Sequence, residues 1–97
     1  MAAIGTFTVQ GDGYSGSIKT LTLDVKAATF RPNKKADDKA PDYRIFVGPT
    51  EFGAAWRRTS REERQYLSVK LDDPSFPAPI YASLVEADGG HSLIWSR

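Results

Sequence analysis

Phe52-Gly-Ala-Ala-Trp-Arg-Arg-Thr59 is the stretch that decides the fold, together with the run Tyr66-Leu-Ser-Val-Lys-Leu-Asp-Asp-Pro74 that follows it. The first run crowds small residues, one large aromatic ring and two guanidinium groups into an extended pattern. A short polar connection separates the two runs, so we predict that they pair as a hairpin. The second run alternates strictly, which predicts an inward row and an outward row, namely Leu67, Val69 and Leu71 against Tyr66, Ser68 and Lys70.

The first run also predicts where its own side chains lie. Strict alternation gives two faces, Phe52, Ala54 and Trp56 on one and Gly53, Ala55 and Arg57 on the other. Trp56 and Trp95 are interpreted as core residues, because each shares a strand face with apolar neighbours. Residues 60–63 have the Ser-x-x-Glu form of a helix cap, but no helical apolar repeat follows, so we expect at most one helical turn there.

The residues before this pair continue the strand pattern. Residues 4–10 alternate as in a strand, and Gly11-Asp-Gly13 is typical of a tight hairpin turn. The return run, residues 14–30, contains alternating apolar residues from Leu21 to Val25 and is too long for one ordinary strand. We expect a bulge or a bend at Gly16, since glycine inside a strand pattern often marks one.

The rest of the chain adds a loop and further strands. Residues 31–41 hold two prolines among mixed charges, which indicates a mobile loop. Residues 42–48 resume the strand pattern, residues 72–77 indicate a turn, and residues 80–97 read as a last hairpin. About seven short strands with regularly spaced turns and no long helix predict an all-β antiparallel meander, either a small barrel or a two-sheet sandwich.

Composition limits the function classes. With 97 residues the chain forms one domain, residues 1–97, and it has no second core. Thirteen Lys and Arg against twelve Asp and Glu give a net charge of +1, which argues against an acidic DNA mimic and against a polybasic binder of nucleic acid or membranes. The chain has no cysteine, no signal-peptide pattern and no apolar run of membrane-spanning length, so we expect a cytoplasmic protein.

A basic and aromatic set lies on the central strands. Pairing of neighbouring strands would bring Arg44, Arg57, Tyr66 and Lys70 to one outer face. Rings that stack on bases and cations that meet phosphates are how small barrels hold single-stranded nucleic acid. The alternative is a solvated face on which cations pair with carboxylates, and the balanced charge favours it. The candidate binding residues are Arg44, Phe46, Arg57, Arg58, Tyr66 and Lys70.

Few residues could carry catalysis or hold a metal. Asp72 and Asp73 could bind a divalent cation or share acid and base roles, but before Ser-Phe-Pro they are interpreted as turn residues. His91 is the only histidine, and beside Gly89-Gly90 at a hairpin end it is interpreted as exposed and incidental. The glycines before residue 14 precede a strand, whereas phosphate loops open a helix. The sequence thus predicts no enzyme activity, no cofactor and no metal site.

Motifs along the whole chain resemble a known family. They are Ile4-Gly-Thr-Phe7, Gly13-Tyr-Ser-Gly16, Thr20-Leu-Thr-Leu-Asp24, Ala40-Pro-Asp-Tyr-Arg44, Gly53-Ala-Ala-Trp56, residues 66–74, Pro79-Ile80, Ala82-x-Leu84 and Leu93-Ile-Trp-Ser-Arg97. In this order they resemble the bacterial domain-of-unknown-function family numbered 736. The resemblance implies a small cytoplasmic protein of plasmids, integrative conjugative elements and other mobile DNA. It implies no activity and no catalytic residues, and relatives often continue beyond Arg97 with a charged tail.

Two functions follow as expectations. The first is a non-enzymatic binding module of a mobile element that uses the basic and aromatic sheet face to bind nucleic acid or a protein of the transfer machinery. The second is an inhibitor of a host defence system, of the anti-restriction or anti-CRISPR type, that acts by protein–protein binding. A homodimer is a further expectation, because an antiparallel meander with an unclosed edge invites pairing between chains.

Overall fold

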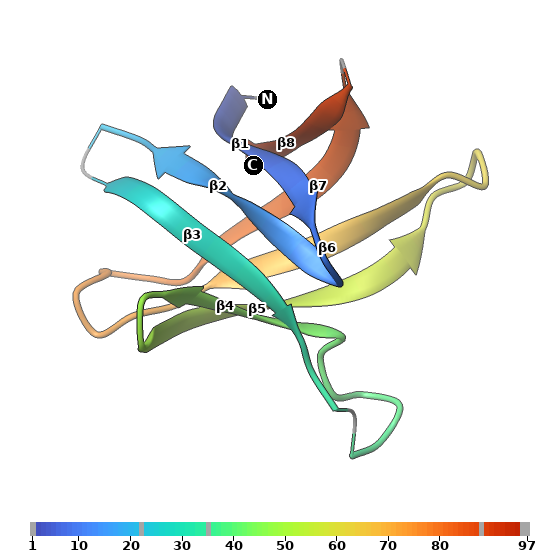
Figure 1. Ribbon diagram of the computed structural model, residues 1–97, viewed down its shortest axis with the longest axis horizontal. Helices are drawn as coiled ribbons and strands as arrows, with labels where there is room; N and C mark the ends of the chain where they lie inside the picture. Colours follow the sequence, from blue (N-terminus) through green and yellow to red (C-terminus); the bar gives the residue numbers. More distant parts are fainter. Residues whose placement is uncertain (1, 22, 35, 88, 96–97) are drawn as a thin grey trace.

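The protein is a closed barrel of antiparallel strands in meander order (Figure 1). The computed structural model describes residues 2–21, 23–34, 36–87 and 89–95. Within them the strands are β1 (Ala2–Gln10), β2 (Gly13–Lys19), β3 (Asp24–Pro32), β4 (Tyr43–Val47), β5 (Thr50–Thr59), β6 (Gln65–Leu71), β7 (Ile80–Ala87) and β8 (Gly90–Trp95). The predicted all-β meander is confirmed, and of its two forms the barrel is the one adopted.

Pairing of β1 with β8 closes the sheet. Each strand then has a hydrogen-bonded neighbour on both sides, so the barrel has no free strand edge. The expectation of a homodimer rested on such an edge, and closure removes that argument for it.

The interior is filled by the inward row of every strand. Phe7 and Phe30 meet edge to face, with ring centroids 5.0 Å apart. The alternation predicted for β6 is confirmed, because Leu67, Val69 and Leu71 are buried while the residues between them are half-exposed. Burial of these apolar side chains is the main stabilising term of the barrel. The fully buried large side chains are Phe7, Phe30, Ile18, Ile45, Leu71, Leu84, Leu93 and Val69.

The predicted return run of residues 14–30 is two strands rather than one. A turn between β2 and β3 replaces the strand expected around Leu21, which is fully exposed there. The Leu23 N–H donates to Oγ1 of Thr20 at 3.0 Å and so closes this turn. Thr22 lies outside the described residues. The β2–β3 register shifts between Gly16 and Ile18, next to the glycine at which we expect a bulge or bend. The extra residue, however, lies on β3, because two residues separate Val25 from Ala28 while one separates Gly16 from Ile18.

A second bulge changes the face assignment of β5. Ile45 pairs with Gly53 and Phe46 with Glu51, so Phe52 is an extra residue between them. Phe52 and Ala55 are both buried, although strict alternation had placed them on opposite faces. The prediction for Phe52 was therefore wrong, because one inserted residue reverses the parity of everything before it.

Trp56 faces outward and is half-buried, so its assignment to the core was wrong. Its indole Nε1–H donates to the backbone carbonyl of Lys39 at 3.0 Å and ties the loop after β3 to the barrel wall. The same loop is closed at its base, where Nδ2 of Asn33 donates to the carbonyl of Pro41 at 2.9 Å. Trp95, in contrast, packs against the core as expected.

Candidate functional site

The outer side of β4, β5 and β6 collects most of the predicted binding residues. Arg44 pairs across β5 with Ala54, and Ala54 pairs in turn with Lys70, so the two cations share one transverse row. Arg58 and Tyr66 are opposite each other further along the β5–β6 hairpin, which projects from the barrel in Figure 1. We call this surface the cationic–aromatic face, defined by Arg31, Arg44, Phe46, Trp56, Arg58, Tyr66 and Lys70.

Arg31 belongs to this face although the sequence had placed it in a loop. Strand β3 continues to Pro32, and Arg31 is the register partner of Arg44. The Arg31 guanidinium carbon lies 4.9 Å from the centroid of the Phe46 ring, a cation–π contact that holds the half-buried ring against the sheet. The alternation of residues 28–31 could have indicated that Arg31 lies on a strand. The proline that follows it led instead to the prediction of a loop.

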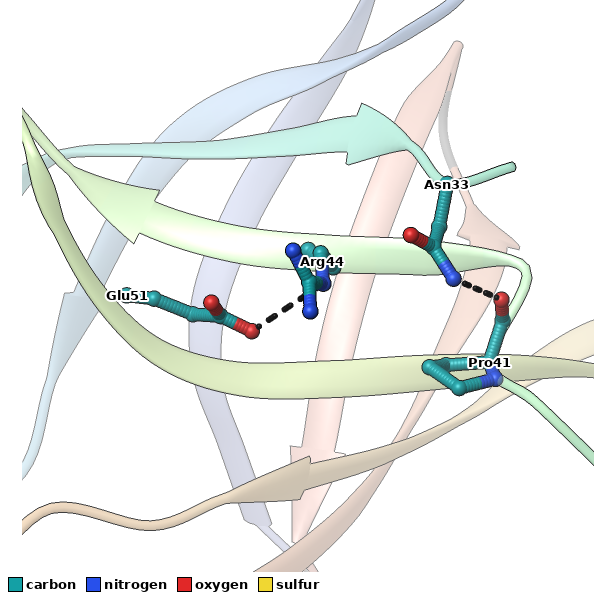
Figure 2. A network of polar contacts seen from close by, with 4 residues as sticks. All are labelled: Asn33, Pro41, Arg44 and Glu51. Atoms are coloured by element: carbon teal, nitrogen blue, oxygen red, sulfur yellow. Dashed lines mark hydrogen bonds and ion pairs between the residues drawn. The ribbon is translucent and has the colours of Figure 1, made fainter. Parts of the chain in front are cut away.

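One carboxylate partly neutralises the face. Arg44 Nε lies 3.4 Å from Oε2 of Glu51, and Figure 2 shows the two side chains pointing toward each other across the β4–β5 pair. Both side chains are about half exposed, at 52% and 42%, so water and salt screen the pair and a ligand can replace the carboxylate. Arg44 is thus positioned by Glu51 and stays available at the surface.

A hollow of about 360 Å³ lies in the middle of the face. Gly53, Ala54, Trp56 and Lys70 are among the residues that line it. The half-buried indole of Trp56 is thus next to small residues in the lining of the hollow. Glu51 and Asp72 also line the hollow, so its lining carries both signs of charge.

Arg57 does not belong to the cationic–aromatic face, so the prediction that it joins Arg44 and Lys70 was wrong. Arg57 is on the same side of β5 as Ala55, two residues further along the strand, and lies at the open end of the barrel. Its Nη2 donates to the hydroxyl of Tyr43 at 3.2 Å, and its guanidinium carbon lies 5.9 Å from that ring's centroid. The backbone N–H of Arg57 donates to Oδ2 of Asp42 at 2.8 Å, which fixes the strand beside the loop.

This open end, which we call the barrel mouth, carries a polar aromatic cluster that sequence reasoning missed. The Tyr14 ring lies 4.8 Å from the His91 ring and 5.7 Å from the Tyr43 ring, centroid to centroid. His91 is half-buried, and its Nδ1 is buried without a hydrogen-bond partner, so its interpretation as exposed was wrong. A cavity of about 180 Å³ opens among Tyr14, Arg57, Gln65, Tyr66, Leu67, Leu84, Glu86 and His91.

The cluster keeps Tyr14 protonated. Burial raises the pKa of the Tyr14 phenol above its ordinary value, and the neighbouring Tyr43 and Glu86 raise it further, while Arg57 opposes them. Tyr14 therefore offers an O–H donor to the mouth throughout the neutral pH range. The ring contacts with Tyr43 and His91 limit how this donor can turn.

The aspartate pair after β6 is a turn, as predicted. The N–H of Ser75 donates to Oδ2 of Asp73 at 2.9 Å, and the Ser75 hydroxyl donates to the same oxygen. These hydrogen bonds stabilise the carboxylate and lower the pKa of Asp73 below its ordinary value. Among the described residues, no group of three or more His, Cys, Asp or Glu could hold a metal ion.

The outer side of β8, β1 and β2 has a different chemistry. An open groove of about 640 Å³ lies over it, and glycine and alanine are among its lining residues. Hydroxyl side chains pair across the strands here, Thr6 with Ser17 and Ser92, and Thr8 with Ser15. Lys26 is the one cationic side chain among the described lining residues. We call this surface the hydroxyl face.

Comparison with known proteins identifies the family. The model of the family described as "Protein of unknown function (DUF736)" matches residues 3–97. The chain belongs to this family. The match covers nearly all of the DUF736 barrel, from β1 to the end of β8, and so confirms the resemblance seen in the sequence. No curated protein and no solved structure matches the chain. In the described part of the chain, no helix has the length and hydropathy to cross a membrane.

Proposed function

We propose that this protein is a non-enzymatic binding protein that holds single-stranded nucleic acid on its cationic–aromatic face. The observation that carries the proposal is the hollow beside Trp56, with Lys70 in its lining and Arg44 in the same transverse row. A base can stack beside the indole while the neighbouring phosphates meet the two cations. Proteins bind single strands by this combination of rings and positive charge.

The spacing of the groups supports a strand that lies across the sheet. Arg31, Arg44 and Lys70 occupy one row on β3, β4 and β6. Neighbouring strands lie about 4.8 Å apart, so the row extends about 14 Å along the curved wall, which corresponds to a few nucleotides. Arg58 and Tyr66 lie further along the hairpin and add a cation and a ring for the next nucleotides.

The carboxylates of the face limit the affinity. Glu51 is paired with Arg44, and Asp72 lines the same hollow as Lys70. Each phosphate that binds must compete with these groups, so we expect modest affinity at physiological salt and a clear gain at low salt. The same reasoning predicts preference for a flexible single strand over a duplex, whose bases are not free to stack on Trp56.

Fluorescence polarisation tests this proposal. A labelled oligothymidylate and a labelled duplex are titrated with the protein at about 50 and about 200 mM salt. We expect the single strand to bind more tightly than the duplex, with an affinity that falls at least about tenfold between the two salt concentrations. Failure of the single strand to bind at low salt contradicts the proposal.

The alternative that we propose is binding to a protein partner, and the mixed charge of the face favours it. The Arg44–Glu51 pair and the closeness of Asp72 to Lys70 make a surface that complements another mixed surface. The partner would then be a transfer-machinery protein of a mobile element, or a component of a host defence system of the anti-restriction or anti-CRISPR type. In this version the protein works in the cytoplasm, where it meets either partner.

A pulldown from a host that expresses such a defence system separates the two versions. Protein binding predicts recovery of a defence or transfer component, with weak salt dependence and loss on Arg44→Glu. Recovery of neither component, together with unimpaired defence against incoming DNA, contradicts the alternative.

A further inference from the structure

The barrel mouth contains opposite charges that do not pair with each other. Arg57 and Glu86 line the same cavity, and both influence the phenol of Tyr14. Among the described residues, neither Arg57 nor Glu86 forms an ion pair. The Arg57 guanidinium donates one N–H to the Tyr43 hydroxyl. The lining of the cavity therefore includes both a cationic donor and an anionic acceptor.

One residue that lines the cavity has a buried polar atom with no partner. His91 Nδ1 is shielded from solvent and makes no hydrogen bond, and a buried unsatisfied polar atom carries a free-energy cost. His91 pairs across strands with Phe7 and with Glu86, so the register of β8 holds its ring in place. His91 thus contributes a fixed ring to the lining of the cavity.

The walls fit a flat ring. Leu67 and Leu84 are buried residues of the cavity's lining, which also includes the rings of Tyr14, Tyr66 and His91. A cavity of about 150 Å³ holds a benzene molecule, so the 180 Å³ of the mouth suits a single six-membered ring with its substituents. The Gln65 amide adds a donor and an acceptor to the lining.

From these features we propose that the barrel mouth holds one unpaired cytosine of a bound single strand. The cytosine amino group donates to the Glu86 carboxylate, as cytosine amines do to acidic side chains in other readers, and its carbonyl oxygen and ring nitrogen accept from Arg57. Thymine lacks the amino group and would leave Glu86 without a donor of that kind. Unstacked bases of single strands are recognised in this way, on their edges and by stacking.

This inference rests on the proposed function, which supplies the single-stranded ligand. The mouth adjoins the β5–β6 hairpin that carries Arg58 and Tyr66, so one strand could reach both. The strand would lie on the cationic–aromatic face and place one base in the mouth. Tyr66 is the residue common to both, since it faces outward on β6 and also lines the cavity.

Fluorescence polarisation with matched oligonucleotides tests the selectivity. Replacing one central thymidine of an oligothymidylate by deoxycytidine should raise the affinity about tenfold. Glu86→Gln should reduce this preference, taken as the ratio of the two affinities, to within about twofold. Glu62→Gln, the same change in the exposed β5–β6 turn, should keep the preference. Equal affinities of the two strands for the wild-type protein overturn the inference and leave the proposed function standing.

A second measurement does not depend on binding of the strand. His91 is the only histidine of the chain, so its imidazole gives one set of NMR signals that reports on the mouth directly. Titration with cytidine monophosphate should shift these signals saturably, and titration with thymidine monophosphate should shift them far less. Absence of a saturable shift with cytidine monophosphate overturns the inference. A saturable shift without any binding of oligonucleotides supports the mouth site and contradicts only the proposed function.

Discussion

The cationic–aromatic face and the hydroxyl face cover the same core but differ in chemistry. On β4–β6 the outward positions hold Arg44, Lys70 and Trp56, whereas on β1 and β2 they hold threonine and serine. Both faces rest on equally buried inward rows, so packing demands neither set of outward residues. The alternating inward residues therefore determine the barrel, while the outward residues are free to bind other molecules.

The largest effect should come from filling the space beneath the hydroxyl face. A Cβ at Gly16 would lie 2.0 Å from the Thr6 carbonyl oxygen and 2.8 Å from the Phe7 ring, so neither backbone nor ring can stay in place. We expect Gly16→Ala to lower the free energy of unfolding by about 3 kcal/mol, measured by urea denaturation. Ser17→Ala, one residue further at an exposed position, should change it by less than about 0.5 kcal/mol. Equal effects of the two variants would show that the packing of the Phe7 ring does not require a glycine at position 16.

A charge reversal on each face should separate their roles in binding. Lys70→Glu places a carboxylate in the lining of the hollow beside Trp56 and should weaken binding to an oligothymidylate about tenfold at low salt. Lys26→Glu makes the same change at the hydroxyl face and should leave the affinity within about twofold. Polarisation titrations measure both. A larger loss with Lys26→Glu would move the binding surface to the other side of the barrel.

A conservative change at Trp56 should separate its ring from its hydrogen bond. Trp56→Phe keeps an aromatic surface beside the hollow but removes the N–H that donates to the Lys39 carbonyl. We expect a loss of about 1 kcal/mol in the free energy of unfolding, with oligonucleotide affinity within about threefold of the wild type. Trp56→Ala should then weaken binding more than Trp56→Phe does. Equal affinities of these two variants would exclude the indole as a stacking surface.

Burial of Tyr14 in the barrel mouth should affect how the free energy of unfolding depends on alkaline pH. The pKa of Tyr14 is raised in the folded protein, so the unfolded chain loses this proton first. The resulting stability is fully present below about pH 10 and is lost as pH rises through the folded pKa. We expect the free energy of unfolding to fall less between about pH 9 and pH 11 in Tyr14→Phe than in the wild type. A steeper fall in the variant would contradict the burial of this phenol.

Much of the fold could be predicted because alternation is local. The inward residues of β6 followed from spacing alone, and Gly16 marked the place where the β2–β3 register shifts, although the extra residue is on β3. Closure of the barrel could not be predicted, since it depends on β1 meeting β8, the two strands furthest apart in the sequence. The face of Phe52 was wrong because the sequence shows no sign of the bulge. Trp56 shares a face with Ala54 as predicted, but that face is the outer one.

Part of the candidate site could be predicted from the sequence, and part could not. Outward residues such as Arg44 and Lys70 were found because their strands alternate regularly. The mouth cluster was missed because Tyr14, Arg57 and His91 come from three strands that only the closed barrel brings together. For a lone histidine the sequence carries no sign of such neighbours.

The most direct test of the account is an NMR titration of the isotope-labelled protein with an oligothymidylate at low salt, followed through its backbone amides. We predict that the shifted amides cluster on β4, β5 and β6, around Arg44, Trp56 and Lys70, with the hydroxyl-face amides of Thr6, Ser15 and Ser17 unchanged. Shifts confined to β8, β1 and β2, or no shifts at all, would contradict it.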